Sequence, residues 1–412
     1  MEINYVQKER ITAKLINWLI ILISLWAFTP VIRVEVNQLY GISCMITTLF
    51  LIILSNKGKI KTEIAVVLFW IGLQVLYKLL GVSDDTWANH SNPFSFFFAM
   101  IACYYLLDNL KKTTLIKTGW ILYGIVTLNL FYHYYIFFLN EKVSLYDVNI
   151  LLEKGIVVGG TSFVTTIAVY GMLNFIFFYL TNTRWKWFYF VNIVLTLYFL
   201  FNIQTRAIAL IILILFMVAV ISLKAGNNVQ TTRLLAFSVF SLVVVFILPE
   251  LLRLLISLDI PYYSRKLTAI LNVVIGNVAI NANSLDESSF TARLFVENVS
   301  LNTWLASPVN FLFGKGFDAG FWFESGIGHH SEVIDILPRY GLLGFLITAY
   351  IFKQYYIIIS RHIKYSGFLF IFWGFIFYAV LNGVYLPENG AAFCWLVPFT
   401  MLSIKEEGNN TL

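Results

Sequence analysis

Several arginines and one pair of histidines are the residues in this chain best suited to chemistry. Arginine is permanently charged, and its planar fork matches phosphate oxygens, so arginines near one another can hold a phosphate or pyrophosphate. The candidates are Arg206, Arg265, Arg293 and Arg339. Histidine titrates near neutral pH and can take a proton from a hydroxyl, which makes His329 and His330 candidates for a general base.

Each of these residues also has a simpler structural explanation. Arg206 stands at the end of an apolar run, where an arginine commonly reaches the lipid headgroups. Arg293 lies in a stretch that can form an amphipathic helix, where it could simply face water. Paired histidines in a loop are more often a surface feature than a base. Residue type alone therefore does not define a site.

Glycines surround the histidines. Residues 311–344 read FLFGKGFDAGFWFESGIGHHSEVIDILPRYGLLG before the chain enters an apolar run. Glycine allows tight turns and a close approach of the backbone to a ligand. The glycines before the histidines are Gly314, Gly316, Gly320, Gly326 and Gly328.

The composition requires lipid as a solvent. Hydrophobic residues make up 59% of the 412 residues and charged residues only 12%, with a mean hydropathy of +0.79. The net charge of +6 does not imply a nucleic-acid partner, because basic residues in membrane proteins collect in cytoplasmic loops. The three cysteines lie in apolar runs and form neither a disulfide framework nor a zinc site.

Runs of about 20 apolar residues predict an all-α polytopic protein with about twelve transmembrane helices. The segments are 15–32, 39–54, 63–81, 93–107, 118–138, 156–181, 188–203, 207–223, 234–257, 337–358, 366–385 and 391–404. With a cytoplasmic N-terminus, sixteen lysines and arginines fall in cytoplasmic connections and four in the short connections opposite, so both termini are predicted to be cytoplasmic.

Three regions follow from this topology. Residues 1–257 carry nine predicted transmembrane helices, residues 258–336 form one large extracytoplasmic loop, and residues 337–412 carry three more helices and a cytoplasmic tail. Within the loop, residues 290–306 are predicted to form an amphipathic helix. Asn129 and His133 share a helical face and are interpreted as interhelical hydrogen-bonding residues in preference to a proton relay.

The order of motifs around the loop resembles the O-antigen polymerase and ligase superfamily. Arg293 is followed by Gly314-Lys315-Gly316, then by His330-Ser331, and Gly341-Leu342-Leu343-Gly344 begins eleven residues after that histidine. Thr205-Arg206 matches the family's Ser/Thr-Arg-Gly, with Ala207 in place of the glycine. Ser331 stands where the ligases usually have asparagine, which is more similar to a repeat-unit polymerase (a Wzy-type protein).

The resemblance implies a GT-C-like fold in the bacterial cytoplasmic (inner) membrane. It implies a polymerase that joins lipid-linked oligosaccharide repeat units of O-antigen, capsule or exopolysaccharide by inverting glycosyl transfer. Donor and acceptor would be polyprenyl-pyrophosphate-linked oligosaccharides, with a chain-length regulator as a further partner and membrane lipid as surroundings. No cofactor is expected, and since the long loop lacks Asp-x-Asp or a histidine-rich ligand set, charge stabilisation by arginine fits better than a divalent metal.

Site residues carry over from the family motifs and their neighbours. Arg206 and Arg293 are expected to hold the pyrophosphate and His330 to act as the catalytic base. Substrate-binding roles are expected for Arg339, Arg265, Gly314, Gly316, His329 and Glu332. A ligase that transfers a finished glycan remains an alternative, as does a non-enzymatic lipid-linked oligosaccharide flippase or transporter. Transporters commonly contain internal repeats, and no convincing repeat relates the two halves of this chain.

Overall fold

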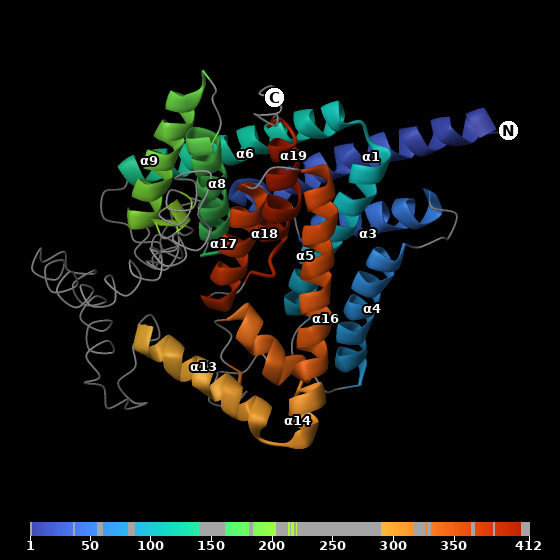
Figure 1. The fold of residues 1–412 in the computed structure, drawn as a ribbon, viewed down its shortest axis with the longest axis vertical. Helices are drawn as coiled ribbons and strands as arrows, with labels where there is room; N and C mark the ends of the chain where they lie inside the picture. Colours follow the sequence, from blue (N-terminus) through green and yellow to red (C-terminus); the bar gives the residue numbers. More distant parts are fainter. Residues whose placement is uncertain are drawn as a thin grey trace, which may run out of the picture.

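The part of the chain that the computed structural model describes is entirely helical (Figure 1). It covers residues 2–35, 38–55, 61–80, 87–139, 161–180, 184–202, 290–316, 326–327, 331–363, 367–381 and 384–404, with positions 213, 214, 216, 217 and 220. The helices are α1 (Glu2–Phe28), α2 (Pro30–Glu35), α3 (Gln38–Ser55), α4 (Thr62–Leu79), α5 (Trp87–Asn109), α6 (Lys112–Leu139), α8 (Thr161–Leu180), α9 (Lys186–Asn202), α13 (Phe290–Leu305), α14 (Pro308–Phe313), α16 (Glu332–His362), α17 (Gly367–Leu381), α18 (Pro387–Ala391), the π-helix η4 (Ala392–Leu396) and α19 (Val397–Met401).

Four of these helices are long and apolar enough to cross a membrane. They contain the segments Ile11–Phe28, Thr62–Leu79, Lys112–Ile136 and Glu332–His362. Shorter apolar helices at Tyr40–Ser55, Phe163–Tyr179, Lys186–Leu200 and Gly367–Ala379 accompany them. A backbone in lipid must satisfy its own hydrogen bonds, which helices do. The described residues are therefore compatible with a membrane protein, while the total of twelve spans and the GT-C-like fold stay predictions.

Helices coincide with ten of the twelve predicted segments, and segments 207–223 and 234–257 lie almost wholly outside the described residues. The amphipathic helix predicted at 290–306 is confirmed as the helix α13. Several helices begin before their predicted segments: α1 at Glu2, α5 at Trp87, α6 at Lys112 and α16 at Glu332, compared with the predicted 15, 93, 118 and 337. The last predicted segment is not one regular helix, because α18, η4 and α19 follow one another there.

Large apolar side chains are exposed on several helices. Trp18 of α1 is 62% exposed, Phe69 of α4 61%, and Trp187 of α9 78%. A protein surrounded by water rarely exposes so many large apolar side chains. These faces therefore suit contact with lipid.

Buried polar side chains join the helices beneath that apolar surface. The Tyr123 hydroxyl of α6 donates to Asn174 Oδ1 of α8, and Asn192 Nδ2 of α9 donates to the Tyr123 oxygen at 3.0 Å. The predicted interhelical hydrogen bond is confirmed for Asn129, whereas the hydrogen bond described for His133 lies within α6. Asn129 Nδ2 donates to Thr29 Oγ1 at 3.1 Å, and His133 Nδ1 lies 2.7 Å from the Asn129 carbonyl.

Replacement of Tyr123 by phenylalanine tests this polar network. The substitution removes the hydroxyl and leaves the buried amides of Asn174 and Asn192 each without one partner, so we expect a loss of about 1–3 kcal/mol of unfolding free energy. The thermal unfolding midpoint of the protein in detergent measures it. Tyr135→Phe, at a 60% exposed position of the same helix, is the matched control and should leave the midpoint unchanged. Equal unfolding midpoints for the two variants would show that the hydrogen bonds of Tyr123 do not contribute to stability.

Candidate functional site

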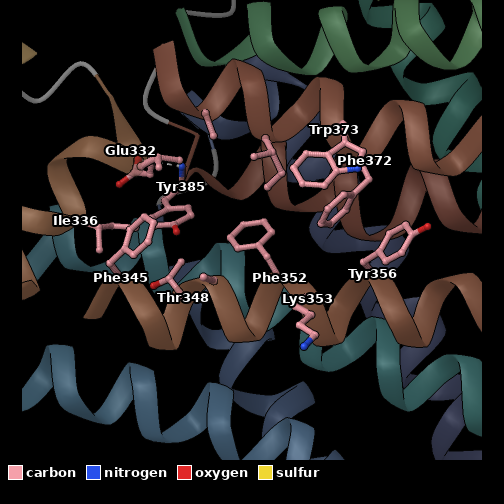
Figure 2. A pocket seen from close by; sticks show the side chains of 14 residues that line it. Glu332, Ile336, Phe345, Thr348, Phe352, Lys353, Tyr356, Phe372, Trp373 and Tyr385 are labelled. Atoms are coloured by element: carbon pink, nitrogen blue, oxygen red, sulfur yellow. Dashed lines mark hydrogen bonds between the residues drawn. The ribbon is translucent and has the colours of Figure 1, made fainter. Parts of the chain in front are cut away.

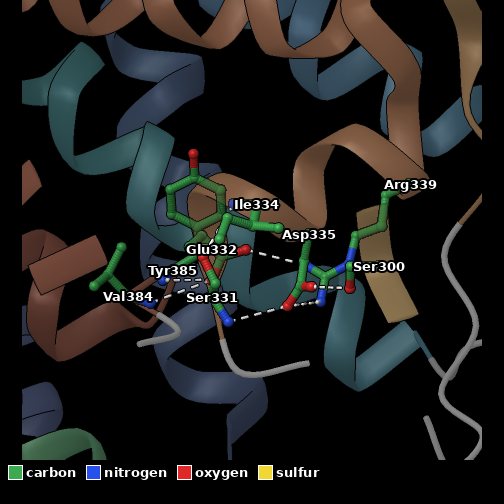
Figure 3. A network of polar contacts seen from close by, with 8 residues as sticks. All are labelled: Ser300, Ser331, Glu332, Ile334, Asp335, Arg339, Val384 and Tyr385. Carbon is green, nitrogen blue, oxygen red and sulfur yellow. Dashed lines mark hydrogen bonds and ion pairs between the residues drawn. The ribbon is translucent and has the colours of Figure 1, made fainter. Parts of the chain in front are cut away.

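A buried cluster of charged and polar side chains lies at the start of α16 (Figure 3). We call it the acid–arginine cluster, and its members are Ser300 of α13 with Ser331, Glu332, Asp335 and Arg339. Each of the five is at most 9% exposed. Buried charges are tolerated only when they are paired, so the charged groups of this cluster must be paired with one another or with a ligand.

Glu332 connects the beginning of α16 with the link between α17 and α18. Its Oε1 accepts from Arg339 Nη1 at 3.0 Å. Its Oε2 lies 3.2 Å from the Val384 backbone nitrogen and 3.4 Å from that of Tyr385, and both N–H groups donate to it. Both carboxylate oxygens are thus engaged by the protein.

Asp335 connects α13 with α16. The Ser300 hydroxyl donates to Asp335 Oδ1 at 2.6 Å, and the Ser331 backbone N–H donates to Oδ2 at 3.1 Å. Arg339 Nη2 lies 3.9 Å from the same Oδ2. Asp335 and Glu332 also lie in the first turn of α16, where the helix dipole favours negative charge.

Ser331 starts the helix. It has extended backbone angles, and its hydroxyl accepts from the Ile334 N–H at 3.0 Å, as an N-cap residue does. The chain can therefore change direction sharply just before Glu332. His330 directly precedes this capping residue in the sequence.

The two glycine motifs meet by close backbone contact. Gly341 interrupts α16 with φ of 66° and ψ of −169°, angles that only glycine adopts readily. The interruption frees the carbonyls of Pro338 and Arg339 from hydrogen bonds within the helix. The Pro338 carbonyl accepts from the Lys315 N–H at 2.7 Å, and the Arg339 carbonyl accepts from the Gly316 N–H at 3.0 Å.

No side chain fits between these two backbones. A Cβ at Gly314 would lie 2.4 Å from the Arg339 carbonyl carbon, and one at Gly341 would lie 2.3 Å from the Leu312 carbonyl. We call this contact of residues 312–316 with residues 338–341 the glycine joint. The glycines at 314 and 341 are thus required by the packing of protein against protein.

Neighbouring elements support the joint. The Tyr77 hydroxyl of α4 donates to the Phe313 carbonyl at 2.6 Å. The Tyr340 ring packs edge-on against Trp70, with ring centroids 5.0 Å apart. At Gly326, which has a φ of 69°, a Cβ would meet Thr303 Oγ1 of α13 at 2.5 Å. Gly326 is therefore also packed against α13.

The predicted site residues divide into three groups. The structure brings together Gly314, Gly316, Glu332 and Arg339 at the glycine joint and the acid–arginine cluster. Arg293 belongs to the backbone of α13, seven residues and so about two helical turns before Ser300, which places both positions on one side of that helix. Outside the described residues lie Arg206, Arg265, His329 and His330.

Asp335 and Ser300 were missed by sequence reasoning. The spacing of Glu332, Asp335 and Arg339 at i, i+3 and i+7 would have indicated one helical face, had the helix been predicted to start early enough. The backbone N–H groups of Val384 and Tyr385 carry no side-chain signal at all. Within the described residues, no three His, Cys, Asp or Glu side chains lie together as ligands for a metal ion.

An apolar cavity of about 320 Å³ adjoins the cluster, between α16 and α17 (Figure 2). Glu332 and Tyr385 line one end, and Tyr356, Trp373 and Lys353 line the other. Glu332 belongs to both the cavity and the cluster, so a molecule in the cavity would extend to the charged groups.

The described part of the protein is thus all-helical and contains four candidate membrane spans. A buried charged cluster lies at the start of one of them, α16, with an apolar cavity beside it. No protein-family model matches the chain, and no curated protein matches it.

Proposed function

We propose that this chain is a bacterial inner-membrane glycosyltransferase of the GT-C type that polymerises lipid-linked oligosaccharide repeat units on the extracytoplasmic face. The donor is a glycan on a polyprenyl pyrophosphate, and the acceptor is a sugar hydroxyl of the next lipid-linked unit. The motifs that resemble the O-antigen polymerase and ligase superfamily motivate this proposal.

The observation that carries the proposal is the meeting of those motifs at the start of α16. Gly314-Lys315-Gly316 contacts the backbone just before Gly341, and α13, which contains Arg293, is hydrogen-bonded to Asp335 through Ser300. The adjoining apolar cavity suits a substrate that carries a hydrocarbon chain.

The proposed step is a direct displacement at the anomeric carbon. The acceptor hydroxyl oxygen forms the new bond to that carbon while the bond from the carbon to the pyrophosphate oxygen breaks. The electron pair leaves with the pyrophosphate, whose charge Arg206 and Arg293 stabilise, and the hydroxyl proton passes to His330. Attack from the face opposite the leaving group inverts the anomeric configuration.

The helices α13 and α14 lie at one end of the molecule, and the start of α1 and the helix α19 lie toward the other (Figure 1). An extracytoplasmic site with both chain termini in the cytoplasm requires such a separation. Arginines are otherwise scarce on the side assigned to the site, where a pyrophosphate would need them.

Glycan length in cells tests the proposal. Cells lacking the gene are complemented with wild type, Arg206→Ala, Arg293→Ala or His330→Ala, and membrane insertion of each variant is checked by blot. We expect each variant to accumulate single lipid-linked repeat units, because loss of a charge-stabilising group or a base slows transfer by about 10²–10⁴-fold.

Other outcomes point to the alternatives. Normal polymer from all three inserted variants would favour a lipid-linked oligosaccharide transporter. Polymer that forms normally on its carrier but is not attached to a lipid core would favour a ligase. Lys315→Ala, which changes an exposed side chain beside the joint, serves as an insertion control.

A further inference from the structure

Basic and aromatic side chains alternate at the turn from α8 to α9, where residues 184–188 read RWKWF. Trp187 is 78% exposed and Trp185 is 61% exposed. Arg184 beside them is exposed, and Lys186 is half-buried. Tryptophan and basic side chains gather in this way where the hydrocarbon of a membrane meets its headgroups.

A third cation reaches the same turn from α6, because α6 and α8 run antiparallel. The ring centroids of Tyr123 and Tyr170 lie 4.9 Å apart, and those of Trp120 and Phe177 lie 5.7 Å apart. The exposed Lys117 stands one helical turn before Trp120, so it is level with the end of α8. We call the set of three cations and two exposed indoles the basic–aromatic patch, and its members are Lys117, Arg184, Trp185, Lys186 and Trp187.

The cations of the patch have no acidic partner in the described part of the chain. Residues 154–249 contain neither aspartate nor glutamate. Asp108, the acidic residue closest to Lys117 in sequence, is bonded to Lys61. None of the three cations forms an ion pair among the described residues, so their charges remain for a ligand to neutralise.

An exposed apolar stripe of α9 begins at the patch. Val191, Val194 and Tyr198 are 49%, 47% and 53% exposed. With Trp187 they are spaced at i, i+4, i+7 and i+11, which places them on one side of the helix. Lipid tails are the surroundings that such a stripe suits, so the patch lies where the tails end and the headgroups begin.

The two halves of the patch together select one class of ligand. The exposed indoles need apolar neighbours, which a dissolved anion does not supply. The three cations need negative charge, which a zwitterionic headgroup of zero net charge does not supply. An anionic phospholipid supplies both, because its tails follow the stripe while its phosphate accepts from the arginine fork and the lysine ammonium groups.

We propose that the basic–aromatic patch binds the headgroup of an anionic phospholipid, with the phosphate among Lys117, Arg184 and Lys186. The start of α9 lies toward the end of the molecule opposite α13 and α14 (Figure 1). The lipid is therefore a structural partner and not a substrate, and the proposal does not depend on the proposed function.

Photolabelling tests the proposal without relying on activity. The full chain is placed in phosphatidylethanolamine nanodiscs that contain a small fraction of phosphatidylglycerol with a diazirine on its headgroup, and labelled peptides are identified by mass spectrometry. We expect labels on the patch. Arg184→Gln with Lys186→Gln should lower this labelling by about thirtyfold, because each basic residue near an anionic surface contributes about fivefold in affinity.

Lys14→Gln with Arg361→Gln is the matched control. It removes two exposed cations from α1 and α16, outside the patch, and should leave labelling of the patch at the wild-type level. Trp187→Ala should weaken labelling by phosphatidylglycerol and by a diazirine-bearing phosphatidylethanolamine by a similar factor, because the ring contacts either lipid. Thermal unfolding midpoints establish that the variants are folded.

The remaining arms separate the possible ligands. Unlabelled phosphatidylglycerol should displace the probe, and dissolved glycerol phosphate should not. Equal labelling of the two double variants, or equal labelling of the wild-type patch by the two lipid probes, would overturn the anionic-lipid site. Displacement by glycerol phosphate as effective as that by phosphatidylglycerol would overturn it as well, and would identify a site for a dissolved phosphate.

Discussion

Gly341→Ala is expected to lose most of the folded protein. The substitution forces a side chain into backbone angles that only glycine adopts readily, at about 1–3 kcal/mol. Its Cβ would also lie 2.3 Å from the Leu312 carbonyl, and such overpacking costs about 1–3 kcal/mol more. The loss of about 2–6 kcal/mol is a large part of the stability of a typical domain. The thermal unfolding midpoint in detergent and the yield of inserted protein measure it.

Two helical glycines provide matched controls. Gly72 and Gly124 have nothing within 4 Å of a built Cβ. Alanine at either position should therefore leave the stability unchanged or raise it by up to about 1 kcal/mol, since alanine has a higher helix propensity than glycine. If Gly341→Ala kept the midpoint of these controls, residues 312–316 could not lie against residues 338–341 as described.

Arg339→Met is expected to destabilise the protein by about 3–5 kcal/mol. The substitution leaves the carboxylate of Glu332 buried without its guanidinium partner, and an uncompensated buried charge is costly. The same substitution at the exposed Arg361, in the last turn of α16, should change stability by less than about 0.5 kcal/mol. The thermal unfolding midpoint again provides the measurement.

The double variant Glu332→Gln with Arg339→Met separates packing from function. The neutral amide oxygen can still accept from the Val384 and Tyr385 N–H groups, so the double variant should regain about 2 kcal/mol relative to Arg339→Met alone. If Arg339 also contacts the pyrophosphate, the recovered protein should remain inactive in glycan assembly. A double variant less stable than Arg339→Met would contradict the pairing, and a fully active one would remove Arg339 from the substrate site.

The helical class and the positions of most helices could be predicted from composition. Lipid leaves the backbone few alternatives, so apolar runs of sufficient length predict helices, and α1, α4 and α6 lie where such runs occur. The start of α16 could not be found this way. Glu332 and Asp335 look like loop residues until Arg339 is seen to share their helical face and to compensate their burial.

The candidate site, too, could be predicted from the sequence only in part. The importance of Gly314 and Gly316 was predicted, but the expected neighbour was a ligand, whereas the close neighbour in the structure is the backbone before Gly341. Contacts between residues so distant in sequence depend on tertiary packing, which local spacing does not report. The roles of His330, Arg206 and Arg265 stay predictions, and of Arg293 only the helix that contains it is described.

The bonds from Glu332 to Val384 and Tyr385 have a consequence for biosynthesis. These donors lie 52 and 53 residues after their acceptor, beyond the end of α17. Since chains emerge from the ribosome in order, the carboxylate has all its partners only after the residues that follow α17 have been synthesised. The charged end of α16 is therefore completed later in synthesis than the helix that carries it.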